Sequence, residues 1–326
     1  MTAGQQPVLS VVVAIVSDTT GLPDANHLEP CLAALTHQTG APPIEIIVPH
    51  LPAVAGIAAV EARYPGVRFA EIPDLETYTG QGGSREHHDE LRARGIALAQ
   101  GRIVALIEDV GVAAPGWAAG MMASHEQAFA GVGGAIENGI DSPLNWAVYF
   151  CDFLRYQNPL PEGESPIASD ANVSYKMASL RKIKPVWREV FHEASVNAAL
   201  RECGERICLA PAAVVYQHRQ GLRIGSALRE RFVWGRSYAA TRAGLAGTPR
   251  RMFWAVFAPA LPLILLYRMT AMAAAKRRTM SAFIKAAPLL GALVVSSALG
   301  EFTGYLTGRA NKTGAPAAEA IARGTR

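Results

Sequence analysis

Four short apolar runs alternate with amphipathic segments over the first 108 residues, and this alternation constrains the fold more than any other feature of the sequence. The predicted strands cover residues 8–16, 44–48, 67–72 and 103–107. The first is nearly all β-branched or apolar, which is typical of a central parallel strand. The segments between them, 27–38, 54–64 and 85–100, carry apolar residues at helical spacing. This order predicts a doubly wound α/β sheet.

Two carboxylates, Glu108 and Asp109, follow the fourth apolar run directly. Open α/β sheets bind their ligands at the carboxyl ends of the strands, so these acids are candidate site residues. Their hard oxygen atoms suit Mg²⁺ or Mn²⁺. The alternative is that both are strand-end acids that cap the following turn.

The second half of the chain has weaker patterns. Helices are predicted at 118–128 and 193–203 and loops at 75–84 and 156–166, whereas strands are predicted at 131–136, 171–177 and 206–216. Pro211 is expected to break the last of these strands, because proline cannot donate to a β-ladder.

A change of composition begins after residue 245. Residues 252–267 and 286–300 carry no charge, but each run is shorter than the ~20 residues that an upright membrane span needs. Lys276, Arg277 and Arg278 lie between the two runs. Shallow insertion, two tilted spans and a pair of soluble core helices all remain open. The predicted organisation is therefore an α/β domain (1–245), a membrane-associated helical segment (246–308) and a disordered tail (309–326).

The charge and the cysteines exclude several classes. A formal net charge of +4 over 326 residues gives no sign of nucleic-acid binding. The four cysteines form no CxxC pair, which argues against a zinc site or a disulfide framework. The first seven residues lack a signal-peptide pattern, so we expect the α/β domain in the cytoplasm.

Several motifs resemble those of the family 2 glycosyltransferases of the GT-A fold. These are the helical stretch 93–101, the acidic strand end followed by Pro115-Gly116-Trp117, the segment 170–176 around Asn172, and the block that begins Phe191-His192-Glu193 and continues through Leu200, Gly204, Ile207, Pro211 and His218. Each motif is weak alone, but their order and spacing are fairly specific, and together they cover residues 8–245.

The resemblance implies a GT-A-like sheet and transfer of a sugar from a nucleotide-sugar donor. The acceptor would be lipid-linked or a polysaccharide, at the cytoplasmic face of the cell membrane. Inverting transfer needs a base for the acceptor hydroxyl, and the family's base position matches Glu193. A solvated carboxylate at a helix N-terminus is the alternative for this residue.

The resemblance also assigns binding residues. It implies donor contacts at Glu108 and Asp109, a Mg²⁺ or Mn²⁺ ion held by Asp109 and His218, and acceptor contacts at Asn172, Trp117, Trp234 and Arg231. Val16 and His50 stand at the strand ends where the family holds the nucleoside, and Arg92 is a basic group that can compensate for the altered ends, so these three are further candidate donor contacts. The alternatives are a turn role for Asn172, a surface role for His218, and a basic helix face on anionic lipid for Arg231 and Trp234.

The motifs depart from the family pattern at three positions. Val110 stands where the family has a second metal-binding acid, His192 replaces the acid before the base, and Ala93 replaces an asparagine. The ends of the first two predicted strands, residues 14–17 and 48–51, also differ from the family's. These altered strand ends favour a rival interpretation, a non-catalytic GT-A-like subunit of an envelope polysaccharide assembly complex. A nucleotidyltransferase is disfavoured, because no glycine-rich loop with a lysine follows the first predicted strand.

Overall fold

The computed structural model describes residues 7–17, 24–52, 54–77, 85–244 and 248–308. Contacts divide the chain into two units, Met1–Gly139 with Tyr156–His218, and Ile140–Arg155 with Arg219–Arg326. The second unit thus begins well before residue 245 and draws on two separate segments. The predicted tail (309–326) and residues 78–84 of a predicted loop lie outside the described residues.

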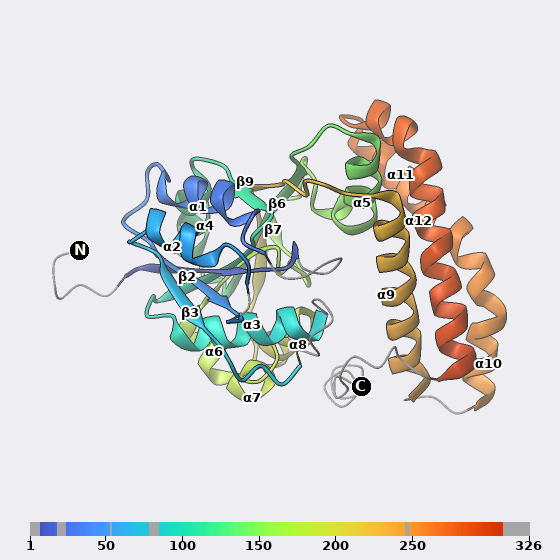
Figure 1. Ribbon diagram of the computed structural model, residues 1–326, viewed down its shortest axis with the longest axis horizontal. Coiled ribbons are helices and arrows are strands. Elements are labelled where there is room, and N and C mark those ends of the chain that lie inside the picture. The colour runs from blue at the N-terminus through green and yellow to red at the C-terminus, as the bar shows by residue number, and fades with distance from the viewer. Residues whose placement is uncertain (1–6, 18–23, 53, 78–84, 245–247, 309–326) are drawn as a thin grey trace. The chain divides into compact units, whose positions relative to one another are not determined.

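Within the described residues, the first unit contains a nine-stranded mixed sheet (Figure 1). Its strands are β1 (Leu9–Ala14), β2 (Glu45–His50), β3 (Arg68–Glu71), β4 (Ile103–Glu108), β5 (Gly111–Ala113), β6 (Gly131–Asn138), β7 (Gly163–Glu164), β8 (Asn172–Lys176) and β9 (Ile207–Gln217). The order is β3-β2-β1-β4-β8-β6-β9-β5, with β7 beside β9. Strands β3, β2, β1 and β4 are parallel, so their carboxyl ends lie at one edge.

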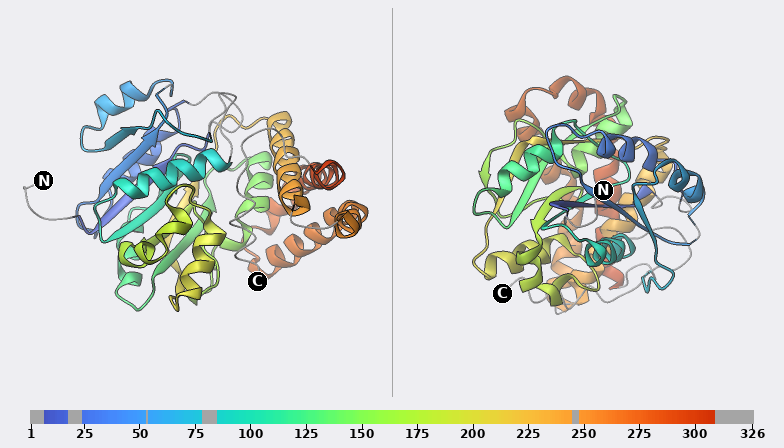
Figure 2. Two further views of the ribbon diagram at one scale, coloured as in Figure 1. Left: turned by 90° about the horizontal axis from the view of Figure 1, so that it is seen from below. Right: turned by 90° about the vertical axis from the view of Figure 1, so that its left-hand side faces the viewer.

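Helices cover both faces of this sheet (Figures 1 and 2). One face carries α1 (Leu28–Thr36), α2 (Ile57–Arg63) and α4 (Trp117–His125), and the other carries α3 (Arg85–Leu98), α6 (Met177–Lys182), α7 (Lys184–Trp187) and α8 (Glu193–Glu202). Successive side chains of a strand point to opposite faces. In β1, Val11 and Val13 accordingly join one core, whereas Val12 joins the other.

The predicted strands and helices of the first 108 residues are confirmed, with ends shifted by a few residues. The prediction of a break at Pro211 is wrong. Strand β9 continues through it, and the register against β6 shifts between Gly134 and Ala135. This irregularity accommodates a proline that has no N–H to donate.

The second unit is a group of helices. They are α5 (Pro143–Asp152), α9 (Ile224–Gly244), α10 (Thr248–Phe257), α11 (Leu261–Lys276) and α12 (Met280–Thr307), and a 3₁₀ turn, Ala258–Ala260, joins α10 to α11. Ser142 caps α5 by accepting a hydrogen bond from the Asn145 N–H at 3.2 Å. The ring centroids of Phe150 and Phe283, in α5 and α12, lie 5.1 Å apart.

Helices α9 and α12 run parallel and make backbone-level contact (Figure 1). The Ser296 hydroxyl donates to the Leu228 carbonyl at 2.8 Å, which fixes their register. Further along, a Cβ atom added to Gly300 would lie 2.1 Å from the Phe232 carbonyl oxygen. One added to Gly304 would lie 2.4 Å from the Arg236 oxygen. Only residues without a side chain fit at these two positions.

Gly300→Ala is therefore expected to destabilise the helical unit by about 1–3 kcal/mol, because the two helices must separate. Helix propensity alone would favour alanine by about 1 kcal/mol, so the sign of the effect is diagnostic. Gly291→Ala is the matched control, because it lies in the same helix with nothing within 4 Å of an added Cβ. Urea unfolding of the detergent-solubilised proteins measures the free energy of unfolding of both variants. A gain in stability for Gly300→Ala would contradict the close contact.

Two helical segments are long and apolar enough to cross a membrane, Thr248–Lys276 with 29 residues and Met280–Thr307 with 28. The most apolar 18 residues of these segments are only 11% and 33% buried. Neither helix is therefore enclosed as the core helix of a soluble protein would be.

Candidate functional site

Asp109 fastens the end of β1 to the end of β4. Its carboxylate accepts hydrogen bonds from the Val16 N–H at 3.0 Å and from the Ser17 hydroxyl, and its own N–H donates to the Ala14 carbonyl at 3.0 Å. The residue is fully buried. The structure thus brings Val16 and Asp109 together, with both carboxylate oxygens of Asp109 bonded to the end of β1.

Arg92 is the centre of the charged groups at this edge of the sheet. It projects from α3, and its side chain is only 4% exposed. The guanidinium pairs with Asp89 at 2.9 Å, Glu108 at 3.2 Å and Asp170 at 3.2 Å. Burial opposes the charged form, but the surrounding carboxylates, first among them Asp170, raise the pKa of Arg92 above its usual value. Arg92 therefore stays charged, and its ion pairs connect α3, β4 and the segment before β8.

Glu193 joins the same group from α8. It is the first residue of that helix and is half-buried. One of its oxygens accepts a hydrogen bond from the Asp170 N–H at 3.0 Å. Its charge also contributes to the raised pKa of Arg92. We call Arg92, Asp89, Glu108, Asp170 and Glu193 the Arg92 cluster.

Gln217, the last residue of β9, completes the cluster on one side. Its amide nitrogen donates to Glu108 at 3.3 Å, and the residue is 3% exposed. Among the described residues, neither the Gln217 Oε1 atom nor the Arg92 Nε atom has a hydrogen-bond partner. Buried polar atoms are normally satisfied, so the unmet acceptor and the unmet donor beside Glu108 are groups that a polar ligand or an ordered water would satisfy.

The residues assigned to a divalent cation do not fit one in this arrangement. Both oxygens of Asp109 are committed to β1, and Glu108 is bonded to Arg92 and Gln217. His218 donates its backbone N–H to the Val110 carbonyl at 2.7 Å, and burial lowers the pKa of its imidazole. The neutral ring is itself able to ligate a metal, so the mismatch lies with the carboxylates that would have to join it. Within the part of the chain that the structure describes, no three His, Cys, Asp or Glu side chains are placed to hold a metal. We therefore do not retain Asp109 and His218 as a metal pair.

Asn172 and Trp117 lie in the core, where neither has exposed surface. The Asn172 amide donates to the carbonyls of Ala135 at 2.7 Å and Ala213 at 2.9 Å, and its oxygen accepts from the Trp117 indole at 2.8 Å. These bonds tie α4 to strands β8, β6 and β9. Because every polar atom of the amide is occupied, we assign both residues to positioning the sheet and not to acceptor contact.

The other predicted binding residues make contacts of their own. His50 ends β2, is 5% exposed and makes a 2.9 Å hydrogen bond to the Leu51 carbonyl. Arg231 belongs to the helical unit, where both of its terminal nitrogens contact Asp152 at 2.6 Å. Its guanidinium also lies 5.1 Å from the ring centroid of Trp234, which is 36% exposed.

Sequence reasoning missed Asp89, Asp170 and Gln217 as parts of the site. Asp170 lies just before the Asn172 motif, and Asp89 precedes Arg92 by three residues on α3. That spacing places two side chains on one helix face and was the available signal. Gln217 offered none, because only the strand order brings the end of β9 to Glu108.

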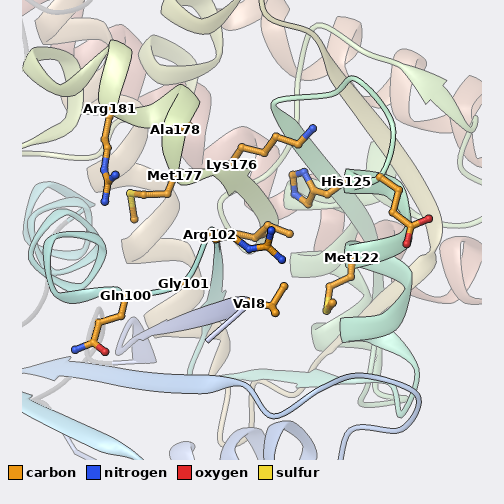
Figure 3. A pocket seen from close by; sticks show the side chains of 12 residues that line it. Val8, Gln100, Gly101, Arg102, Met122, His125, Lys176, Met177, Ala178 and Arg181 are labelled. Carbon is orange, nitrogen blue, oxygen red and sulfur yellow. The ribbon is translucent and has the colours of Figure 1, made fainter. Parts of the chain in front are cut away.

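A cavity of about 530 Å³ lies at the opposite edge of the sheet, where β1 and β4 begin (Figure 3). Arg102, Lys176 and Arg181 contribute basic groups to its lining. The Lys176 ammonium donates to the Gln127 carbonyl at 2.9 Å. The cavity thus lies away from the Arg92 cluster.

His125, which lines this cavity, is expected to make folding stability depend on pH. Burial, with help from the charge of Lys176, lowers the pKa of its imidazole to about 4. The unfolded chain protonates this histidine near pH 6.5, whereas the folded chain does not. Stability is therefore expected to fall by about 3 kcal/mol between pH 6.5 and pH 4, and His125→Gln should remove this loss. Urea midpoints at the two pH values test it. His37→Gln, at an exposed histidine, is the control. If it reduced the loss of stability between the two pH values as much as His125→Gln does, the assignment to His125 would be contradicted.

No family model matches the chain, and no curated protein sequence does. Solved structures, however, do match the chain. A mannosyltransferase from Pyrobaculum calidifontis, solved with GDP-Man and Mn²⁺, matches 91% of this chain and 87% of its own with a TM-score of 0.51 and 16% identity. The S. aureus protein TarS, solved with UDP-GlcNAc, matches 68% of this chain and 65% of its own at a TM-score of 0.43 and 12% identity. The first of these comparisons shows that the chain shares the fold of a glycosyltransferase.

Proposed function

We propose that this chain is an inverting glycosyltransferase. It moves a sugar from a nucleotide-sugar donor to a lipid-linked or polysaccharide acceptor at the cytoplasmic face of the cell membrane. The observation that carries the proposal is the Arg92 cluster, which gathers Glu193 and Glu108 beside unmet buried polar atoms at the carboxyl edge of the sheet. The fold shared with a mannosyltransferase solved with GDP-Man supports a nucleotide-sugar donor.

Glu193 is the proposed base. The hydrogen bond from the Asp170 N–H fixes one carboxylate oxygen, and the helix N-terminus favours the negative charge. A carboxylate held in this way can receive a proton without reorientation. Arg92 keeps Asp170 in place, so it acts on Glu193 through that residue.

The proposed step conserves atoms and charge. The acceptor hydroxyl transfers its proton to Glu193 as its oxygen attacks the anomeric carbon of the donor sugar. The bond from that carbon to the diphosphate breaks on the opposite face, and the nucleoside diphosphate leaves with the electron pair. No part of this step passes through a cation, because the residues that the structure describes do not group three ligands for one.

The remaining binding roles are proposals of the same kind. The ends of β1 and β2, at Val16 and His50, are the proposed donor contacts together with Glu108. Asp109 fixes the position of Val16. Trp234 is the proposed acceptor contact in the helical unit, and Arg231 orients its ring.

Calorimetric titration of the purified, detergent-solubilised protein with GDP-sugars and UDP-sugars tests the proposal. Saturable binding of at least one donor, followed by transfer to a lipid-linked acceptor, is the expected result. A folded protein that binds no donor, with or without Mg²⁺ and Mn²⁺, would overturn it. That result would favour the non-catalytic subunit.

A further inference from the structure

Helices α10 and α11 expose a stripe of large apolar side chains. Phe253, Val256 and Phe257 are 57%, 69% and 54% exposed, and Leu263 and Tyr267 are 74% and 76% exposed. Within each helix these residues recur at three- and four-residue spacing, so they share one side. Apolar patches of this kind on a protein surface mark an interaction site. We call these five residues the apolar stripe.

The charge around the apolar stripe indicates what covers it. Residues 248–300 contain seven Lys or Arg residues and no Asp or Glu. Two of the seven, Arg250 and Arg268, lie on the stripe-bearing helices and are exposed. An apolar helix side bordered only by cations matches the interface of an anionic bilayer, where acyl chains meet negative headgroups.

The lengths of the charge-free runs argue against a crossing. Arg251 and Arg268 bound one run of 16 residues, and Lys285 and Glu301 bound another of 15. At 1.5 Å per residue these measure roughly 24 Å and 22 Å, whereas the hydrocarbon core is about 30 Å thick. Arg268 is exposed, so it would face lipid in an upright span.

The packing of α9 along α12 argues in the same direction. The Ser296 hydroxyl bonds to the Leu228 carbonyl, which places the exposed Arg229 beside the second charge-free run. Arg231 follows Arg229 within one turn of α9, and it pairs with Asp152 of α5. A crossing of α12 would carry these charges into the membrane, and Arg229 has no apolar cover there.

We propose that the helical unit binds an anionic bilayer from one side, with α10 and α11 lying in the headgroup region, and does not cross it. This rests on the membrane association within the proposed function but not on sugar transfer. Both tests below need no donor, so they can fail or succeed independently of the enzymatic assignment.

Sidedness is the first test. Ser281 is exposed at the start of α12, next to the turn that a spanning hairpin would place on the far side. Cys203 is exposed and marks the side of the α/β unit. Full-length protein with Ser281→Cys is treated with a membrane-impermeant maleimide in sealed membrane vesicles. The introduced thiol and Cys203 are expected to react together. Reaction of Cys203 alone, with the introduced thiol reacting only after permeabilisation, would overturn the proposal.

Vesicle flotation is the second test, with phosphatidylcholine alone and with phosphatidylcholine and phosphatidylglycerol at about 3:1. We expect binding to the anionic vesicles to weaken roughly a hundredfold when three cations are neutralised near the membrane. The test variant carries Lys276→Gln, Arg277→Gln and Arg278→Gln. The control variant has the same change of charge on exposed residues of the α/β unit, and it carries Arg181→Gln, Lys184→Gln and Arg188→Gln. Equal losses in both variants would contradict the proposal. So would a stable dimer without vesicle affinity, since a second copy would then cover the stripe.

Discussion

Glu193→Gln is expected to lower the rate of sugar transfer by about 10²–10⁴-fold while leaving folding and donor affinity close to those of the parent protein. Glutamine keeps the shape of the side chain and can still accept the Asp170 N–H hydrogen bond, but it cannot take up the acceptor's proton. Transfer rates at saturating donor, together with donor titration, separate the two effects.

Glu202→Gln is the matched control for this experiment, because Glu202 is exposed at the other end of the same helix. We expect it to change neither rate nor affinity. Full transfer activity in Glu193→Gln would end the assignment of Glu193 as the base. A variant that loses donor binding as well would move Glu193 from the reaction to the donor site.

Arg92→Met is expected to destabilise the α/β unit by about 3–5 kcal/mol, because it leaves Asp89, Glu108 and Asp170 crowded together without their common cation. For a unit of this size the loss corresponds to roughly 6–20 °C in Tm. Unpaired buried carboxylates favour protonation, so their pKa values should rise in the variant. The loss is then greatest near pH 7 and shrinks as the pH falls and the carboxylates protonate.

Arg94→Met provides the comparison for Arg92. Arg94 lies two residues further along α3, but its side chain is 37% exposed and pairs with Glu90 at 3.3 Å. The Glu90 carboxylate is buried, but it keeps its hydrogen bonds from the Glu76 and Thr77 N–H groups when Arg94 is replaced, so the expected loss is only about 1 kcal/mol. Thermal unfolding at pH 7 and pH 5 measures both variants. Equal losses, or a loss for Arg92→Met that does not depend on pH, would contradict the central role of Arg92.

The first four strands and three helices could be predicted from the sequence because their signals are local. A run such as 103–107 is apolar throughout since both faces of β4 are covered, and α1 carries its apolar residues at helical spacing. The position of Glu108 at the carboxyl edge followed from the same argument.

Pairings between distant segments could not be predicted in this way. Strand β8 lies antiparallel between β4 and β6, although more than sixty residues separate it from β4. That placement brings Asp170 to Arg92 and buries Asn172 against Trp117. The sequence does not distinguish a carboxylate that binds a ligand from one that hydrogen-bonds to a neighbouring strand, as Asp109 does. Only the hydrogen-bond partners of Asp109 distinguish them.

The discontinuous make-up of the helical unit limits how this protein can be shortened. A chain ended at residue 245 would retain α5 and α9 but lose α12, the helix that contacts Phe150 and Leu228. Two helices would then present to water the sides that they normally bury. Crystallisation of the α/β unit is therefore better served by removing residues 140–155 together with everything after residue 218, and by closing the first gap with a short linker, than by cutting at the change of composition.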